Sequence, residues 1–438
     1  MHKLKIFLII TLLVFIQVSC NTTDPKVEPE LLLKLEDVSC TEAWLQLSTN
    51  NIQLPATINL LKNNSVAQTL NLSTTDSLLY IDSLLPNQNY SFQVSSIQSA
   101  TGGPVSSNKV PVTTLDTTSH NFTWQTFTFG QHQHSVLYDV AVIDENNIWA
   151  VGAIYMNDSL GNPDPTSFNA VHWDGQHWEL KKIGGIGGWA CHTVFAFSAN
   201  DIWFEGTIHW DGASYNVHKN GWPLMPNGDG WQVNRMWGSN SNDLYAVGNN
   251  GNIAYYNGTS WTKLESGTTV NLNDVWGNAD GKTGWACGYT DDYGTSALIK
   301  IKDGVVEKVF EGFSNSQSNG YYVGPMSGVW SDNVYRVFLM NWGGIYLQQN
   351  NNQFYIEKEI ARFSNAGFGM DGTAYNNIFA CGVGFVGHWN GYTYQEYPEL
   401  FQQQRTFKSV KANTNIVCAV GMDYNSPIYS NAVIVLGK

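Results

Sequence analysis

A short pattern recurs through the last three quarters of the chain: an aromatic residue, then Ala, then Val or Cys, then Gly. Its copies, some of them imperfect, are Trp149–Gly152, Trp203–Gly206, Tyr245–Gly248, Trp285–Gly288, Tyr335–Phe338, Phe379–Gly382 and Cys418–Gly421. Successive copies begin 54, 42, 40, 50, 44 and 39 residues apart. Repeats of this length are typical of four-stranded propeller blades. The pattern therefore predicts a seven-bladed β-propeller, with six blades and one insertion as the alternative because the fifth copy is the least regular.

Turn residues flank each copy and divide it into strands. An Asn or Asp turn precedes most copies, as at Asn242-Asp243, and residues of this kind tolerate the positive φ of a hairpin. A third strand then ends in an Asp-Gly or Asn-Gly turn, as at Asp174-Gly175, and an aromatic residue such as Trp178 opens a fourth, outer strand. The seventh copy ends at Lys438 without that outer strand.

The missing strand stands at the other end of the propeller sequence. The segment 121–129 precedes the first copy and resembles the outer strand that begins at Trp261. An unpaired sheet edge is a liability that closure removes. We therefore expect 121–129 to pair into the last blade and to close a propeller that spans residues 120–438.

Residues 31–116 have a different pattern, with alternating apolar and polar residues in short runs between Asn, Gly, Pro and Ser clusters. This spacing is typical of a β-sandwich. Trp44 is suited to filling the space between two sheets, and Leu84–Tyr90 resembles the tyrosine corner of fibronectin type III domains. The resemblance implies a spacer or adhesion module before the propeller.

The first twenty residues are typical of an export signal, with Lys3 and Lys5 before an apolar run too short to span a bilayer. The end of that run resembles the lipobox of bacterial lipoproteins, which implies lipidation at Cys20. An ordinary secretory signal in 1–20 is the alternative. Residues 21–30 are polar and contain proline, as a flexible tether does. We expect an outer-membrane lipoprotein of the cell envelope, periplasmic or surface-exposed, held to the membrane only through its lipid.

Composition narrows the possible partners. The formal net charge is −14, which repels nucleic acid and anionic lipid surfaces. Besides Cys20 the chain has an odd number of cysteines, Cys40, Cys191, Cys287, Cys381 and Cys418. Three of these lie in the repeated apolar strands, which favours buried free thiols over a disulfide framework.

The repeat style resembles the bacterial propellers related to photosystem assembly factors and BNR-repeat proteins, and that resemblance carries no catalytic motif. A strict Asp-box is absent. A sialidase-like site would gather three arginines on a carboxylate, but the chain has only Arg235, Arg336, Arg362 and Arg405. Asp139, Glu205 and Asp274 are possible general acids or bases near the channel.

Loops on one face of a propeller converge around its channel and form the expected ligand site. Rings in these loops favour stacking on sugars or packing against a protein, and the candidates are Trp189, Trp222, Trp231, Tyr293, Tyr322 and Trp342, with Tyr155, Tyr321, Tyr424 and Tyr429 beside them. A weaker metal candidate combines His132 and His134 with His192. The recurring His172, His209 and His388 hold equivalent places in different blades, which indicates a repeated structural role.

Together these patterns predict a monomeric, non-catalytic protein without cofactors, whose propeller face binds a glycan or a cell-envelope protein. The alternative is a glycan-processing hydrolase, sialidase-like or another glycosidase, that uses the same face.

Overall fold

The computed structural model describes residues 29–96, 104–225, 230–278, 281–332, 336–349, 354–402, 404–424 and 429–438. Within these ranges the chain is all-β, apart from two single-turn 3₁₀ helices, η1 (Asn249–Gly251) and η2 (Pro398–Leu400). None of the helices in the described ranges has the length and apolar character needed to cross a bilayer. The predicted signal sequence, its Cys20 and most of the tether lie outside the described residues.

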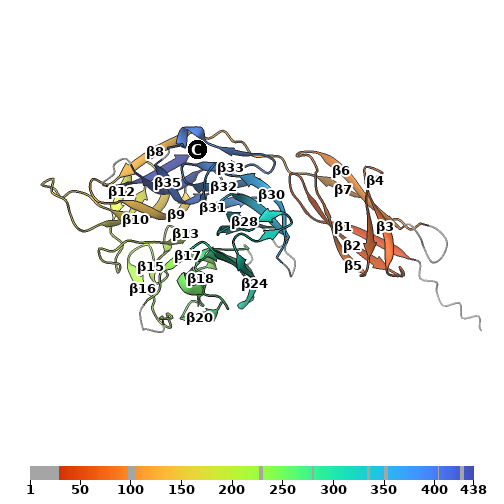
Figure 1. Ribbon diagram of the computed structural model, residues 1–438, viewed down its shortest axis with the longest axis horizontal. Coiled ribbons are helices and arrows are strands. Elements are labelled where there is room, and N and C mark those ends of the chain that lie inside the picture. The colour runs from red at the N-terminus through yellow and green to blue at the C-terminus, as the bar shows by residue number, and fades with distance from the viewer. Residues whose placement is uncertain are drawn as a thin grey trace, which may run out of the picture. The chain divides into compact units, whose positions relative to one another are not determined.

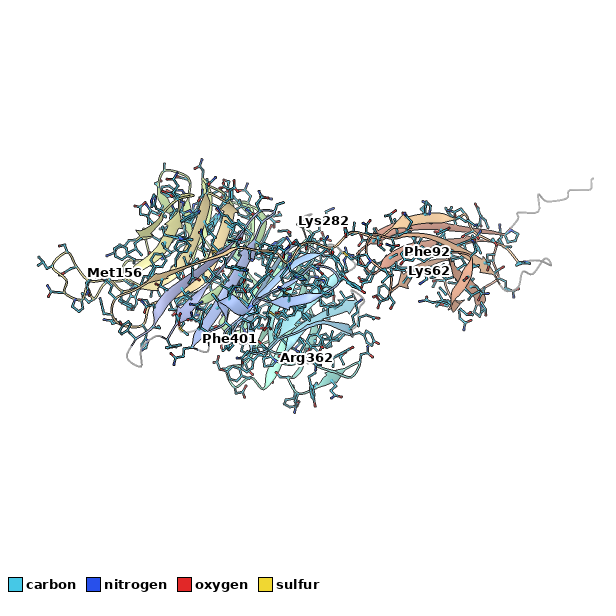
Figure 2. The ribbon with its side chains drawn as sticks, turned by 90° about the horizontal axis from the view of Figure 1, so that it is seen from above. Lys62, Phe92, Met156, Lys282, Arg362 and Phe401 are labelled. Atoms are coloured by element: carbon cyan, nitrogen blue, oxygen red, sulfur yellow. The ribbon has the colours of Figure 1, made fainter. Side chains whose placement is uncertain are left out.

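The chain forms two compact units. The first contains two antiparallel sheets. One sheet has the order β1 (Glu30–Val38), β2 (Ala43–Asn50), β5 (Asp76–Ile81), and the other has the order β4 (Ser65–Leu72), β3 (Ala56–Lys62), β6 (Asn89–Ser96), β7 (Val110–Thr113). Trp44 is buried and packs on Tyr80, with 5.3 Å between ring centroids. In the second sheet Phe92 is fully buried, and it lies opposite Lys62 on the neighbouring strand (Figure 2).

The second unit contains seven four-stranded antiparallel sheets. Six of them have strands in chain order from the innermost outward. They are β9 (Val136–Asp144), β10 (Asn147–Ile154), β11 (Phe168–Trp173), β12 (Trp178–Lys181); β13 (Val194–Ser198), β14 (Asp201–Phe204), β15 (Ile208–Trp210), β16 (Tyr215–Val217); β17 (Val233–Asn240), β18 (Asp243–Gly248), β19 (Asn252–Tyr256), β20 (Trp261–Glu265); β21 (Leu272–Gly277), β22 (Thr283–Tyr289), β23 (Thr295–Lys302), β24 (Val305–Phe313); β27 (Met326–Trp330), β28 (Arg336–Asn341), β29 (Gly344–Gln349), β30 (Ile356–Arg362); and β31 (Gly367–Ala374), β32 (Asn377–Gly382), β33 (Val386–Trp389), β34 (Tyr394–Glu396). A two-stranded hairpin, β25 (Gln317–Ser318) and β26 (Tyr321–Tyr322), lies between the fourth and fifth sheets in the sequence.

The seven sheets follow one another around a ring, which is the architecture of a β-propeller. Each innermost strand contacts the innermost strand of the next sheet, and β35 contacts β9. Figure 1 shows β9, β13, β17, β31 and β35 gathered around the centre. The second strand of each sheet is covered on both faces by neighbouring sheets, so it is an almost continuous apolar run. In β10, for example, every residue after Asn147 is buried.

The outer strand of the seventh sheet comes from the start of the propeller sequence, as predicted. That sheet has the order β35 (Arg405–Ala412), β36 (Val417–Asp423), β37 (Asn431–Gly437), β8 (Trp124–Phe129). The pairing of β8 with β37 runs from Gly437 opposite Trp124 to Ala432 opposite Phe129. Phe127 and Phe129 also pack against the core between the seventh and first sheets. The two ends of the propeller therefore share one sheet.

The expected position of the fifth copy was wrong by three residues. In the fifth sheet Phe338 pairs with Trp330, which lies three residues after Ser327, a β-bulge residue with no match in β28. In the first sheet Trp149 pairs with Ala141, which lies three residues after the corresponding bulge residue Tyr138. The fifth copy therefore begins at Phe338, and Arg336 precedes it. Because Asn341 takes the place of the usual glycine, the motif by itself did not show this register.

Candidate functional site

The innermost strands of six sheets carry a β-bulge close to the point where each strand begins. The pairing with the second strand shifts there and leaves one residue unmatched, namely Tyr138, Asn234, Asn273, Ser327, Phe368 and Lys408. A bulge re-aims its extra side chain. All six residues line one cavity of about 600 Å³, together with His192, Gln232, Arg235, Tyr289, Tyr293 and Trp342. We call this cavity the mouth.

The second sheet also contributes to the mouth. Glu205 donates its backbone N–H to the carbonyl of Thr193, at 3.2 Å. This pairing corresponds to that of Val151 with Asp139 in the first sheet. His192 therefore takes the place that Tyr138 takes one sheet earlier, and the residue at this place in each of the seven sheets lines the same cavity.

The glycine of the repeated pattern makes room for the bulge. A Cβ atom on Gly152 would overlap the carbonyl oxygen of Val136, two residues before the bulged residue of the facing strand. The same overlap with a facing carbonyl would occur at Gly248, Gly288, Gly382 and Gly421. Glycine accepts a backbone this close because it has no Cβ; in the fifth sheet Asn341 holds this place. The pattern thus marks where the inner strand bends, and the bend builds the mouth.

Aromatic side chains form a continuous wall of the mouth. Trp342 lies 4.6 Å from Tyr293, 6.0 Å from Tyr289 and 6.3 Å from Phe368 between ring centroids. Tyr138 packs on His192 at 4.8 Å. Rings in contact in this way keep their positions while leaving faces and edges for a ligand. The wall is therefore formed before any ligand arrives.

Two turns hold the most prominent rings. Asp292 accepts hydrogen bonds from the Thr290 hydroxyl at 2.5 Å and the Gly294 N–H at 3.0 Å, which lower the pKa of its carboxyl group. The turn places Tyr293 at φ 59°, with half of its surface exposed. The buried Asn341 stabilises the turn at Trp342 by accepting the N–H groups of Gly343 and Gly344, at 2.8 and 3.0 Å.

Arg235 lines the mouth and also belongs to a network of charged and polar side chains beneath it. Its Nη1 donates to Asp139 and, at 3.1 Å, to the Ser409 hydroxyl, while its Nε lies 3.3 Å from Asp274. Burial opposes the charge of Arg235, but the two carboxylates hold the pKa of its guanidinium above the ordinary value. Burial raises the pKa of Asp274, in spite of Arg235. Both acids are buried and do not line the mouth.

Lys408 differs from Arg235 because no acidic side chain in the described part of the chain pairs with it. Its ammonium group lies 5.0 Å from the centre of the Phe368 ring. No ion pair among the described residues includes Lys408. Burial lowers the pKa of its ammonium group. Lys408 therefore brings an uncompensated positive charge to the wall of the mouth.

The six rings expected to bind a ligand separate into different environments. Tyr293 and Trp342 line the mouth. Trp222 and Trp231 instead stack on each other, with centroids 5.1 Å apart, in the apolar core of the second and third sheets. Tyr322 is 61% exposed in β26 and is not part of the mouth. The mouth thus brings together two of the six.

Trp189 lines a second cavity that joins the mouth. This cavity has a volume of about 360 Å³ and shares His192 and Gln232 with the mouth. Trp189 is 80% exposed on its wall. Apolar lining comes from Ile186, Ile208 and Val217, and charged lining from Glu205 and Lys219. We call this second cavity the side groove; it extends the mouth along the second sheet.

The three histidines considered for a metal have separate partners. His132 shares a hydrogen bond of 2.9 Å with the Met156 carbonyl, in the loop labelled by Met156 in Figure 2. His134 contacts the ring of Tyr424, and His192 Nδ1 lies 3.4 Å from Glu205. In the described part of the chain no three His, Cys, Asp or Glu side chains gather as a metal site requires.

Sequence reasoning missed most of the mouth. The residues that it did not name are Tyr138, Gln232, Asn234, Asn273, Tyr289, Ser327, Phe368 and Lys408, and Arg235 was named without being assigned to ligand binding. What the bulged residues share is their position in the repeat, because each occupies the same place in its copy. Their residue types differ from blade to blade, so a search for a recurring residue type does not find them.

Comparison with known proteins identifies the architecture. No protein-family model matches the chain, and no curated protein matches it. Among solved structures, Ycf48 bound to D1 peptide is 14% identical, with a TM-score of 0.51 over 73% of this chain and 96% of that one. The WD40 β-propeller domain of Doa1 is 11% identical, with a TM-score of 0.49 over 73% of this chain and 97% of that one. The extracellular domain of BT4673 from B. thetaiotaomicron is 12% identical, with a TM-score of 0.47 over 89% of this chain and 50% of that one. At these identities the likeness concerns the fold, a β-propeller.

Proposed function

We propose that this chain is a non-catalytic binding protein whose mouth and side groove hold a segment of a protein partner. The observation that carries the proposal is the convergence of one residue from every sheet on a single cavity walled by rings. A concave site with aromatic walls and a few directed polar groups is the usual form of a ligand site.

The shape of the site favours an extended ligand. The mouth and the side groove share His192 and Gln232, so one ligand can run from the bulged residues to Trp189. A similarly folded protein, Ycf48, has been solved with a peptide bound. A polypeptide segment offers both the length and the alternating side chains to occupy the two cavities. A glycan stacked on the same rings is the second ligand class that the experiment must test.

The environment of the acidic residues supports binding over hydrolysis. A glycosidase needs two carboxyl groups that face the substrate. Asp139 and Asp274 are buried against Arg235, and Glu205 accepts the backbone N–H of His192. None of the three lines the mouth, and only Glu205 reaches the side groove.

The remainder of the proposal concerns the position of the protein in the cell. We propose that Cys20 is lipidated, that residues 31–116 form a fibronectin type III-like spacer, and that the propeller of residues 120–438 faces its partner in the cell envelope. The two sheets of β1 to β7, with Trp44 buried, are consistent with such a sandwich.

The test uses the chain without its predicted signal sequence, residues 1–20. Its binding is measured to a library of peptides from envelope proteins and to a glycan array, and its hydrolysis of a panel of chromogenic glycosides is measured as well. We expect a peptide ligand whose affinity falls at least about thirtyfold in Tyr293→Ala/Trp342→Ala, because central aromatic rings commonly contribute about 2 kcal/mol. Tyr322→Ala removes an exposed ring outside the mouth and should change the affinity less than twofold.

Three results would contradict the proposal. If the double variant kept its affinity for the peptide, the mouth would be excluded as the binding site. If the chain bound glycans and no peptide, the ligand would be a glycan and not a polypeptide. Turnover of a glycoside that is lost with the mouth rings would restore the hydrolase alternative.

A further inference from the structure

The polar atoms that the mouth leaves without partners are hydrogen-bond donors. The amide Nδ2 of Asn273 is buried and has no acceptor among the described residues, whereas the indole N–H of Trp342 faces the Tyr289 hydroxyl. The contacts of Arg235 with Asp139, Ser409 and Asp274 use Nη1 and Nε, so they do not involve Nη2. A buried donor without an acceptor is costly. A ligand that brings acceptors removes that cost.

The charges of the mouth favour the same kind of ligand. The chain has a formal net charge of −14, yet neither Asp nor Glu occurs among the residues that line the mouth. Its ionisable lining includes Arg235, Lys408 and His192. Asp139 and Asp274 both face Arg235 and offset its charge, whereas no carboxylate pairs with Lys408 among the described residues. Lys408 is therefore the cation of the mouth that can attract a negatively charged ligand group.

We infer that the mouth contains a carboxylate-binding subsite, in which Lys408 provides the charge and Asn273 Nδ2 and Arg235 Nη2 provide hydrogen-bond donors. This inference rests on the proposed function and identifies the group that the partner inserts. A carboxylate has two oxygens and about four acceptor positions, so it can use several of these donors at once. The adjacent rings of Phe368, Tyr293 and Tyr289 accommodate an apolar group next to the carboxylate.

The first experiment uses small probes on the intact exported chain. Binding of 3-phenylpropionate and of 3-phenylpropionamide is measured by ligand-observed NMR. The two probes differ in the terminal group, which is a charged carboxylate with acceptors only in one and a neutral amide with both donors and an acceptor in the other. We expect the carboxylate to bind at least tenfold more tightly than the amide. Glucuronate and N-acetylneuraminate test a sugar as the source of the carboxylate, and tighter binding of these acids than of 3-phenylpropionate would overturn the peptide source.

Two variants test the residues. Lys408→Met keeps most of the stem that packs on Phe368 and should weaken the carboxylate at least tenfold while leaving the amide within twofold. Asn273→Asp places a negative charge in the mouth and should have the same selective effect. Lys263→Met is the matched control, because Lys263 is paired with Glu265 in β20 and is absent from the mouth. Thermal melts identify any variant that fails to fold.

The outcomes separate this inference from the proposed function. Equal affinity for acid and amide, or unchanged carboxylate binding in both folded variants, overturns the subsite even if a protein partner is captured. Selective carboxylate binding by a chain that captures no polypeptide supports the subsite and overturns the proposed partner instead.

Discussion

At the scale of single residues, three histidines show how the repeat uses one side chain for one purpose. His172, His209 and His388 each pack on the first aromatic ring of the pattern in their sheet, with centroids 4.5 to 4.7 Å apart. Each ring also shares a hydrogen bond through Nε2, of 2.9 to 3.0 Å, with the residue two positions before that aromatic. The structural role expected for these histidines is therefore observed.

His388 gives a pH prediction. It is fully buried, and burial, together with His120 at 3.0 Å, lowers its pKa from 6.5 to about 3. The unfolded chain takes up a proton at a higher pH than the folded chain does. The stability associated with a neutral His388 is thus complete above pH 6.5 and is lost as the pH falls from 6.5 towards 3.

Chemical denaturation at pH 7 and pH 4.5 measures this effect. The free energy of unfolding of the unchanged protein should fall by about 2–3 kcal/mol more than that of His388→Asn, which lacks the titrating group. His177→Asn, at an exposed histidine, should behave like the unchanged protein. Equal losses in the unchanged protein and His388→Asn would show that this ring is not kept neutral.

At the scale of strands, two features shape the propeller: the bulges of the inner strands and the pairing of its two ends. The bulges near the start of the inner strands turn seven similar sheets into one cavity lined by unlike residues. The pairing of β8 with β37 removes the exposed edge that the seventh sheet would otherwise have. Alternation along the strands predicted where strands lie, but a bulge shifts the register by one residue and leaves no mark in that alternation.

Deleting residues 121–129 tests the closure. The change removes β8, leaves the outer edge of β37 without a partner strand and takes Phe127 and Phe129 from the core. We expect the propeller to lose its cooperative thermal transition, measured by circular dichroism in the β region. Replacing residues 158–162, in an exposed loop, by Gly-Gly should leave the transition almost unchanged. A normal melt after loss of β8 would contradict the closure.

At the scale of the whole molecule, the mouth belongs to one of the two compact units. Every residue that lines the mouth lies between Tyr138 and Lys408, in the second unit. A chain without residues 21–116 should therefore bind 3-phenylpropionate with a Kd within twofold of that of the full chain. Ligand-observed NMR of the two chains checks this, and a change of Kd of more than tenfold would show that the first unit contributes to the site.

The sequence alone determined the features that repetition and alternation encode: the all-β class, the number and order of the sheets, and the closing strand. These follow from local patterns that each copy repeats. Tertiary structure decided which rings form the site. Trp222 and Trp342 were both expected on the ligand-binding face, but Trp222 stacks against Trp231 in the core and Trp342 lines the mouth. The ion pair of Asp139 with Arg235, between strands two sheets apart, also arises only when the ring closes. Contacts of this kind depend on the register and packing of distant strands, which no local pattern specifies.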